Sequence, residues 1–210
     1  MLKLQIIVGS TREGRQADAV VKWLVPVAKA HGAFEVELLD LREWPLPFFQ
    51  ETLATVGDFK NPTYSLPIVK QWNQKIGEGD AYLFVTAEYN HSVPGVLKNA
   101  LDSVFVSFGF RNKPAGMVGY SNGAAGGARA VEHLAQIGFE ADMHCLRDTV
   151  LLPRVQEAFG KDGAPTDPMV AAALKVTLDD LAWWGALLKA ARPTQLVPGG
   201  FRVRAALAPR

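Results

Sequence analysis

Short apolar runs that suit β-strands alternate along this chain with longer segments whose apolar residues recur at helical spacing. Regular alternation of this kind predicts parallel strands joined by right-handed helical crossovers, with helices on both faces of the sheet. We therefore expect an α/β fold in three layers around a five-stranded parallel sheet. The predicted strands are residues 2–8, 34–39, 81–86, 115–119 and 143–152, and the predicted helices are residues 17–28, 68–76, 97–108, 128–137 and 170–188.

Some of these elements carry irregular features. Pro26 lies inside the first predicted helix and should kink or shorten it, because proline lacks the N–H that a helix needs. The last predicted strand continues in an extended form to residue 152, and residues 44–67 are irregular and rich in proline and aromatic residues. The apolar stripe of the third predicted helix consists of Leu97, Ala100, Leu101, Val104, Phe105 and Phe108.

Length and composition favour one ordinary domain in a reducing compartment. The 210 residues fit a single domain over residues 1–190, followed by a solvated tail over residues 191–210. The net charge of +1 predicts no binding to nucleic acid or to an anionic membrane. Cys145 is the one cysteine of the chain, so a disulfide framework is excluded. With neither a leader pattern nor a spanning run in the sequence, we expect a cytoplasmic protein.

The loop after the first predicted strand, residues 9–16, reads Gly-Ser-Thr-Arg-Glu-Gly-Arg-Gln. Small residues and a helix N-terminus let backbone N–H groups converge on an anion, and Arg12 and Arg15 can pair with phosphate. The alternative is a tight turn with two solvated arginines. The loop matches neither the glycine fingerprint of dinucleotide-binding folds nor the nucleoside triphosphate loop. Asp40, which ends the second predicted strand, is interpreted as a turn residue.

The loop after the third predicted strand begins at Glu88 and is polar and aromatic. Asn90 and Ser92 offer donors and acceptors at the strand terminus, and Tyr89 offers a planar wall, which together suit a flat heteroaromatic ring. The alternative, compatible with the first, is that Asn90 and Ser92 cap the next helix, with Pro94 in its first turn.

The loop after the fourth predicted strand, residues 119–127, contains four glycines that allow the backbone to come close to a ligand. Its alternative is a merely flexible loop. Ligands of open α/β sheets bind outside the carboxyl ends of the strands, so the three loops together predict one pocket with a phosphate end and a ring end. The four histidines have no metal-ligand spacing, so we expect no metal site.

On these loops the chain resembles the NADPH-dependent FMN reductase family, which includes quinone, azo-dye and chromate reductases. The most specific segment, residues 88–102, is similar to the family's PEYN-S-PG-LKNA-D signature, with Ala87 where proline is usual. Residues 9–12 and 45–49 are also typical, and the resemblance extends over about residues 2–188. Arg15 and Ala17 depart from the serine and asparagine that some relatives carry.

The resemblance implies a flavodoxin-like fold that binds FMN and uses NADPH or NADH as a substrate. It implies an oxidoreductase that passes hydride from nicotinamide to FMN and then electrons to a quinone-like, azo or metal-oxyanion acceptor, by a ping-pong mechanism. The flavin would carry the chemistry, so no catalytic side chain is assigned. The implied cofactor-binding residues are Ser10, Arg12, Gln16 and Ala17 at the phosphate, and Ala87, Glu88, Tyr89, Asn90, His91, Ser121 and Gly123 around the ring.

The expected partners are a small-molecule electron acceptor and further copies of the chain. The aromatic, proline-rich residues 44–49, together with the family's habit, predict a homodimer or homotetramer. Two other functions stay open. A flavodoxin-type electron carrier would also bind FMN, but such carriers are usually strongly acidic. A flavin-free regulatory protein can share the same fold.

Overall fold

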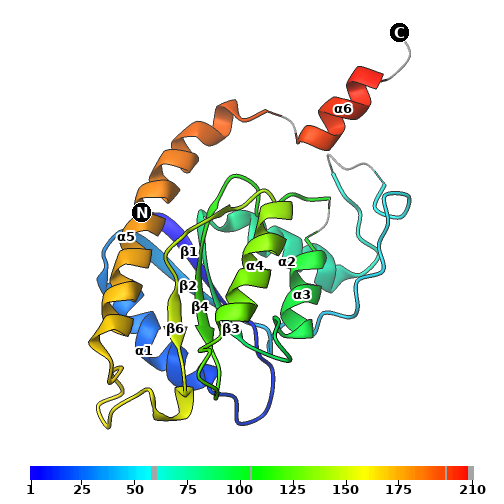
Figure 1. Ribbon diagram of the computed structural model, residues 1–210. Helices are drawn as coiled ribbons and strands as arrows, with labels where there is room; N and C mark the ends of the chain where they lie inside the picture. Colours follow the sequence, from blue (N-terminus) through cyan, green and yellow to red (C-terminus); the bar gives the residue numbers. More distant parts are fainter. Residues whose placement is uncertain (58–60, 105, 197, 208–210) are drawn as a thin grey trace.

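The computed structural model describes residues 1–57, 61–104, 106–196 and 198–207. The chain folds around one parallel sheet whose strand order is β2-β1-β3-β4-β5, with β6 also paired to β4 (Figure 1). The predicted α/β class and parallel sheet are therefore confirmed. The strands are β1 (Leu2–Val8), β2 (Phe34–Asp40), β3 (Ala81–Ala87), β4 (Pro114–Tyr120), β5 (His144–Cys145) and β6 (Val150–Leu152).

The fifth predicted strand is divided in two. His144–Cys145 pairs with β4 at Pro114 and Ala115, and Val150–Leu152 pairs with it at residues 118–120. Four residues, 146–149, therefore span a distance that two residues of β4 span, and the excess must bulge out of the ladder. The expectation of one continuous extended run over residues 143–152 was wrong in this respect.

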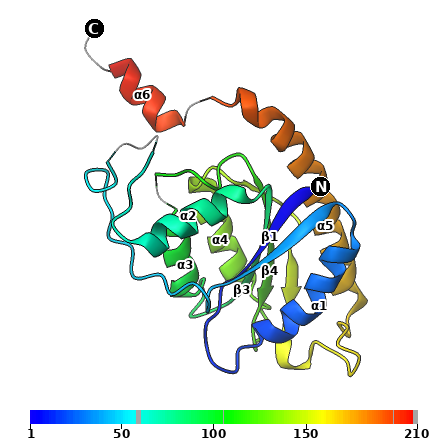
Figure 2. The same cartoon turned by 180° about the vertical axis from the view of Figure 1, so that it is seen from behind.

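Helices cover both faces of the sheet, as predicted. One face packs on α1 (Ala17–Ala30) and α5 (Pro168–Ala191), and its core includes Val20, Leu24, Leu174 and Leu178. The other face packs on the remaining helices of the sandwich, and Figure 2 shows this layer from behind. These helices are α2 (Pro67–Glu78), α3 (Gly95–Asp102) and α4 (Ala128–Glu140).

Two predicted helix features differ from the structure. The helix α1 continues through Pro26 to Ala30, so the proline does not shorten it. Pro26 is exposed, and water can therefore satisfy the carbonyl that loses its helical partner. The helix α3 ends at Asp102 rather than near residue 108, because Val106 and Phe108 adopt positive φ angles that a helix excludes. Phe105 of the predicted stripe lies outside the described residues.

The segment after α5 is attached to the amino edge of the sheet, the upper edge in Figure 1. A 3-10 turn, Arg192–Thr194, leads to a last helix, α6 (Gly199–Leu207). The Arg192 guanidinium donates to Asp80 at 3.1 Å, and the Asn112 side chain donates to Gln195 at 2.8 Å. Residues 197 and 208–210 lie outside the described residues, and the division between domain and tail stays a prediction. Among the described residues, no helix combines the length and apolar character that a membrane span requires.

Candidate functional site

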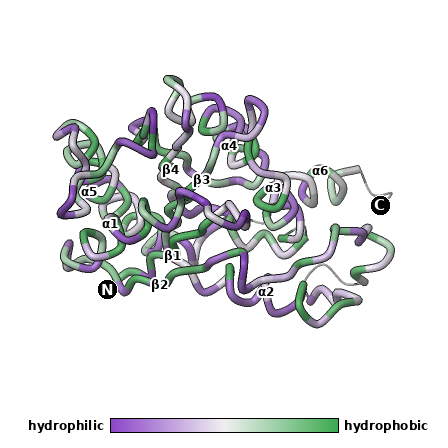
Figure 3. Tube along the Cα trace, turned by 90° about the horizontal axis from the view of Figure 1, so that it is seen from below, coloured by the Kyte–Doolittle hydropathy of each residue, from purple (hydrophilic) through white to green (hydrophobic). Residues whose placement is uncertain are grey.

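Three loops meet at the carboxyl edge of the sheet because β1, β3 and β4 are neighbours that end at the same level. Val8 lies opposite Val85 in the ladder, and Ala87 lies opposite Tyr120. Backbone hydrogen bonds then join the loops: Gly9 N–H donates to the Val85 carbonyl at 2.8 Å, and Glu88 N–H donates to the Tyr120 carbonyl at 3.0 Å. Figure 3 looks onto this edge, where hydrophilic stretches of chain lie across the strand ends. The sequence predicted this juxtaposition correctly.

The first loop brings Ser10 and Arg12 to Tyr89 of the second loop. The Ser10 and Tyr89 hydroxyls are 2.7 Å apart and hydrogen-bonded. The guanidinium carbon of Arg12 lies 3.6 Å from the centre of the Tyr89 ring, which is a cation–π contact. Ser10 is buried and Arg12 is exposed. One hydroxyl and one exposed guanidinium therefore converge at the expected phosphate end of the pocket.

Arg15 occupies a different place from Arg12. Its guanidinium forms a two-pronged pair with the carboxylate of Asp40 and also contacts Asp18. The hydrogen bonds to Asp40 raise the pKa of Arg15 further above its ordinary value. Burial opposes the ionisation of Asp40, but hydrogen bonds from Arg15 and from the Arg42 N–H outweigh it and hold the pKa of Asp40 below its ordinary value. Neither alternative for Arg15, phosphate ligand or solvated turn residue, describes this buried pair.

The start of α1 completes the phosphate end. Gln16 is the residue before the helix and makes no side-chain capping bond, and Ala17 is the buried first residue. The first N–H groups of α1 therefore lack a side-chain cap, and such groups favour an anion. Gln16 and Ala17 lie beside the loop as expected from sequence.

The second loop is a tight turn. Tyr89 and Ser92 exchange backbone hydrogen bonds of 2.8 and 3.1 Å, and the two residues between them have φ angles of 49° and 67°. Those two residues, Asn90 and His91, therefore project from a left-handed turn at the rim of the pocket. The capping alternative was wrong: the residue before α3 is Pro94, with no side-chain cap, and the Ser92 hydroxyl is bonded to His133 Nδ1 at 2.9 Å.

Arg129, in the first turn of α4, is a site residue to which the sequence analysis assigned no role. Its guanidinium forms an ion pair with Glu88, whose side chain is 4% exposed, and bonds His91 Nε2 at 2.8 Å. It thus links the second loop to the helix that follows the third. The one signal in the sequence is its position directly after the glycine-rich loop, because a helix start at that point must face the carboxyl edge.

Packing and backbone hydrogen bonds fix the conformation of the third loop, and its glycines divide into two kinds. A Cβ on Gly127, where φ is +89°, would lie 2.3 Å from the Tyr120 nitrogen, so this glycine packs against β4 and not against a ligand. A Cβ on Gly123 would meet nothing nearer than the Ser121 hydroxyl at 4.0 Å. Ser121 and Gly123 therefore lie at the open part of the loop, where the sequence analysis placed the far side of the ring.

Polar side chains lie at both ends of the site. Glu88 Oε2 and Arg129 Nε, on the second loop and at the start of α4, are buried without a hydrogen-bond partner among the described residues. The Tyr120 hydroxyl lies near Ser10, Tyr89 and Arg15, at the phosphate end. Buried polar atoms without partners are costly, and a ligand can satisfy them. Burial raises the pKa of Tyr120 to about 12, so its hydroxyl keeps its proton at neutral pH. Together with Ser10 and Arg12, these groups fit both ends of FMN.

Aromatic residues line a cavity of about 500 Å³ beside the first loop. Its walls include Thr11, Trp44, Phe48 and Val96. The side-chain amide of Asn99 fixes this wall, since it donates to the Pro47 carbonyl at 2.9 Å and accepts from Phe49 N–H at 2.9 Å. Residues 44–48 therefore lie beside the first loop of the site.

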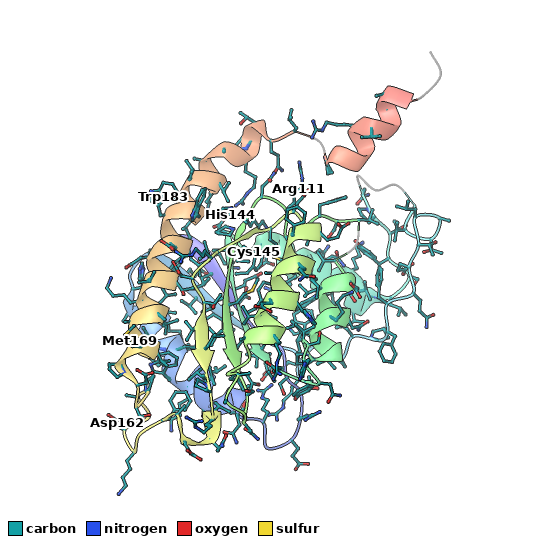
Figure 4. All side chains as sticks on the ribbon, in the orientation of Figure 1. Arg111, His144, Cys145, Asp162, Met169 and Trp183 are labelled. Atoms are coloured by element: carbon teal, nitrogen blue, oxygen red, sulfur yellow. The ribbon has the colours of Figure 1, made fainter. Side chains whose placement is uncertain are left out.

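Cys145 and His144 lie apart from this site. Figure 4 shows both in the upper half of the molecule, far from the loops at the lower edge. The Cys145 thiol is free, and burial raises its pKa, which makes it a poor nucleophile at neutral pH. No group of three potential metal ligands occurs within the described part of the chain.

Comparison with known proteins agrees with this geometry. The model of the family described as NADPH-dependent FMN reductase matches residues 2–157. The chain belongs to this family. It is 32% identical over 186 residues to an NAD(P)H-dependent FMN reductase of Pseudomonas aeruginosa, covering 87% of this chain and 95% of the relative. It is also 32% identical over 183 residues to an NAD(P)H:quinone oxidoreductase of Solanum tuberosum, covering 85% and 90%.

A solved structure of the same kind is the flavoenzyme NAD(P)H:(acceptor) oxidoreductase of Paracoccus denitrificans. It has a TM-score of 0.70 and 26% sequence identity, and the match covers 89% of this chain and 98% of that one. The flavodoxin-like fold of the FMN reductase family is therefore confirmed for this chain.

Proposed function

We propose that this FMN reductase family member is an FMN-dependent NAD(P)H oxidoreductase that reduces a small-molecule acceptor. The observation that carries the proposal is the placement, at one sheet edge, of a phosphate end and of a second polar end. Ser10, Arg12 and the Tyr120 hydroxyl form the first, and the Glu88–Arg129 pair forms the second. FMN, when bound, supplies the redox chemistry by taking a hydride from nicotinamide and passing electrons to the acceptor.

The residues of the chain then bind and orient the cofactor. Ser10, Arg12 and the start of α1 at Gln16 and Ala17 hold the phosphate. Around the ring we place the backbone and side chains of Ala87, Glu88, Tyr89, Asn90, His91, Ser121 and Gly123, and we add Arg129. We add Tyr120 to the phosphate end, beside Ser10. The neutral hydroxyl of Tyr120 can donate one hydrogen bond, and the Glu88–Arg129 pair offers an acceptor beside a donor.

The acceptor is a quinone-like, azo or metal-oxyanion compound that enters beside the aromatic wall. The Solanum relative is named for quinone, and the cavity lined by Trp44 and Phe48 is apolar enough to receive a planar ring. With the loops after β3 and β4 on one side of the flavin, one open face is left for nicotinamide and acceptor in turn. We therefore expect ping-pong kinetics.

Steady-state kinetics test this proposal. NADPH and NADH should each be assayed against a panel of quinones, an azo dye and chromate, at several concentrations of the best acceptor. Double-reciprocal plots should be parallel, and excess quinone should inhibit competitively against nicotinamide. Intersecting lines would show a ternary complex and hence two separate sites.

We further propose that the protein is a cytoplasmic homodimer or homotetramer. A second cleft, of about 1030 Å³, opens between α3, α4 and residues 48–51, and its lining includes Leu101, Val106, Phe108 and Ile137. An apolar cleft of this size beside the exposed Phe48 suits a second copy of the chain. Light scattering at micromolar concentration should give a mass of two or four chains. A monomer mass across that range would contradict the proposal.

A further inference from the structure

Two arginines hold three successive backbone carbonyls of the first loop. Arg15 Nη1 donates to the Ser10 carbonyl at 2.5 Å. Arg42 Nε donates to the Thr11 carbonyl at 3.4 Å, and Arg42 Nη2 donates to the Arg12 carbonyl. The carbonyls of residues 10–12 therefore all face the arginine side of the loop.

The direction of the carbonyls sets the direction of the N–H groups. The described chain contains no cis peptide bond. In a trans peptide unit the C=O and the N–H of the next residue point to opposite sides. The N–H groups of Thr11, Arg12 and Glu13 must then point away from the two arginines. Successive N–H groups that face one side of a loop form an anion-binding concavity.

Asp40 fixes the arginines in turn. Its carboxylate accepts Arg15 Nη1 at 2.7 Å, Arg15 Nη2, and the backbone N–H of Arg42 at 3.0 Å. The side chains of Arg15 and Asp40 are 5% and 17% exposed, so solvent competes little with this two-pronged pair. Asp18, which is half exposed, accepts from both arginines at 2.8 and 3.4 Å. The charge of Arg15 is thereby balanced by carboxylates.

We propose that Arg15, Asp40 and Arg42 are positioning residues that hold the first loop ready for the phosphate of FMN without binding it themselves. The inference rests on the proposed function, because it assumes that this loop receives FMN. Discrimination between FMN and riboflavin then depends on a carboxylate, Asp40, whose negative charge by itself would repel the phosphate.

A direct electrostatic effect of Asp40 and a positioning role predict opposite changes in FMN affinity, so one substitution distinguishes them. The variant Asp40→Asn removes one negative charge near the phosphate end, so electrostatics alone would tighten FMN binding. The positioning role predicts the reverse, because the neutral amide no longer holds Arg15 and Arg42. FMN and riboflavin should be titrated into wild type, Asp40→Asn and Arg15→Lys, with Glu43→Gln as the matched control. Glu43 is exposed, its N–H donates to the Asp40 carbonyl at 2.9 Å, and its variant loses the same charge.

In Asp40→Asn and Arg15→Lys we expect FMN to bind about tenfold more weakly and riboflavin to change less than about twofold. In Glu43→Gln, FMN binding should be unchanged or slightly tighter. Amide hydrogen exchange of residues 10–13, in protein without flavin, should become faster in the first two variants. If either variant fails to fold, Arg42→Gln, at a half-exposed side chain, replaces it in the same measurements.

Three results would overturn the inference. FMN that binds Asp40→Asn as tightly as wild type, or more tightly, would show that the carboxylate acts by charge or not at all. Equal weakening of FMN and riboflavin would show a merely structural role. If wild type itself binds neither flavin, the proposed function fails and the positioning role falls with it, and that result is distinguishable because it appears before any substitution.

Discussion

The first and third loops of the site follow neighbouring strands and lead into helices, yet they are held in different ways. Charged side chains hold the first loop, through Arg15, Asp40 and Arg42. Backbone contacts hold the third, since Val155 N–H donates to the Ser121 carbonyl at 3.0 Å and Gly127 packs on β4. We therefore expect the first loop to respond to changes of charge and pH, and the third loop to changes in side-chain size.

The largest effect should follow from a shape change in the third loop. Gly127→Ala puts a Cβ 2.3 Å from the Tyr120 nitrogen at a φ of +89°. Strain and overpacking should lower the free energy of unfolding by about 3–5 kcal/mol, measured by urea denaturation. The matched control, Gly123→Ala, enters open space and should change the free energy by less than about 0.5 kcal/mol. Equal effects in the two variants would break the distinction between the glycines.

A charge change in the first loop should act on FMN binding instead. Arg12→Ala removes a guanidinium from the phosphate end, and a charge-assisted hydrogen bond contributes about 1.5–3 kcal/mol. FMN should therefore bind roughly ten- to a hundredfold more weakly, while riboflavin should barely change. Titration calorimetry with both ligands measures this. If FMN and riboflavin binding weaken equally, Arg12 does not bind the phosphate.

The first loop should also make the stability of the protein depend on pH, through Asp40. The pKa of Asp40 is lower in the folded chain than its ordinary value of about 3.9, so its contribution is present above that value and lost as pH falls through the lower folded pKa. The unfolding free energies of wild type and Asp40→Asn should differ by about 1–2 kcal/mol at pH 7.

That difference should stay constant down to about pH 5 and then shrink as pH falls through the ordinary pKa of about 3.9 toward the lower folded pKa. Denaturation of both proteins at pH 7, 5, 4 and 3 measures it. A difference that widens toward acid would have the wrong sign for a carboxylate stabilised by Arg15, and would contradict the account of this loop.

The sequence predicted those parts of the molecule that depend on local pattern and on sheet topology. Alternating strands and helices were enough to give the parallel sheet, and the strand ends then placed Ser10, Tyr89 and Ser121 at one edge. The sequence did not predict ion pairs between residues that lie far apart along the chain. Arg15 and Asp40 are 25 residues apart, and each has an ordinary role as a turn residue when considered alone.

Local patterns also misled where tertiary contacts outweigh them. Ser92 is a good capping residue by type, but His133 engages its hydroxyl, and α3 begins after Pro94 without a side-chain cap. The apolar pattern beyond Asp102 suited a helix, but Val106 and Phe108 adopt positive φ and line the cleft beside α4. The first departure lies in the second loop of the site. The second lies beyond the far end of α3, near the start of β3, where the Tyr82 hydroxyl donates to the Gly109 carbonyl at 3.1 Å.

The oxidoreductase activity is tested most directly by the reaction of FMN-loaded protein with nicotinamide in the absence of acceptor and oxygen. Stopped-flow mixing with one equivalent of NADPH or NADH should bleach the flavin absorbance fully, and a later addition of quinone should restore it. Failure of both nicotinamides to bleach the flavin at any useful rate would contradict the oxidoreductase account and favour an electron carrier, and a protein that retains no flavin would favour a regulatory role.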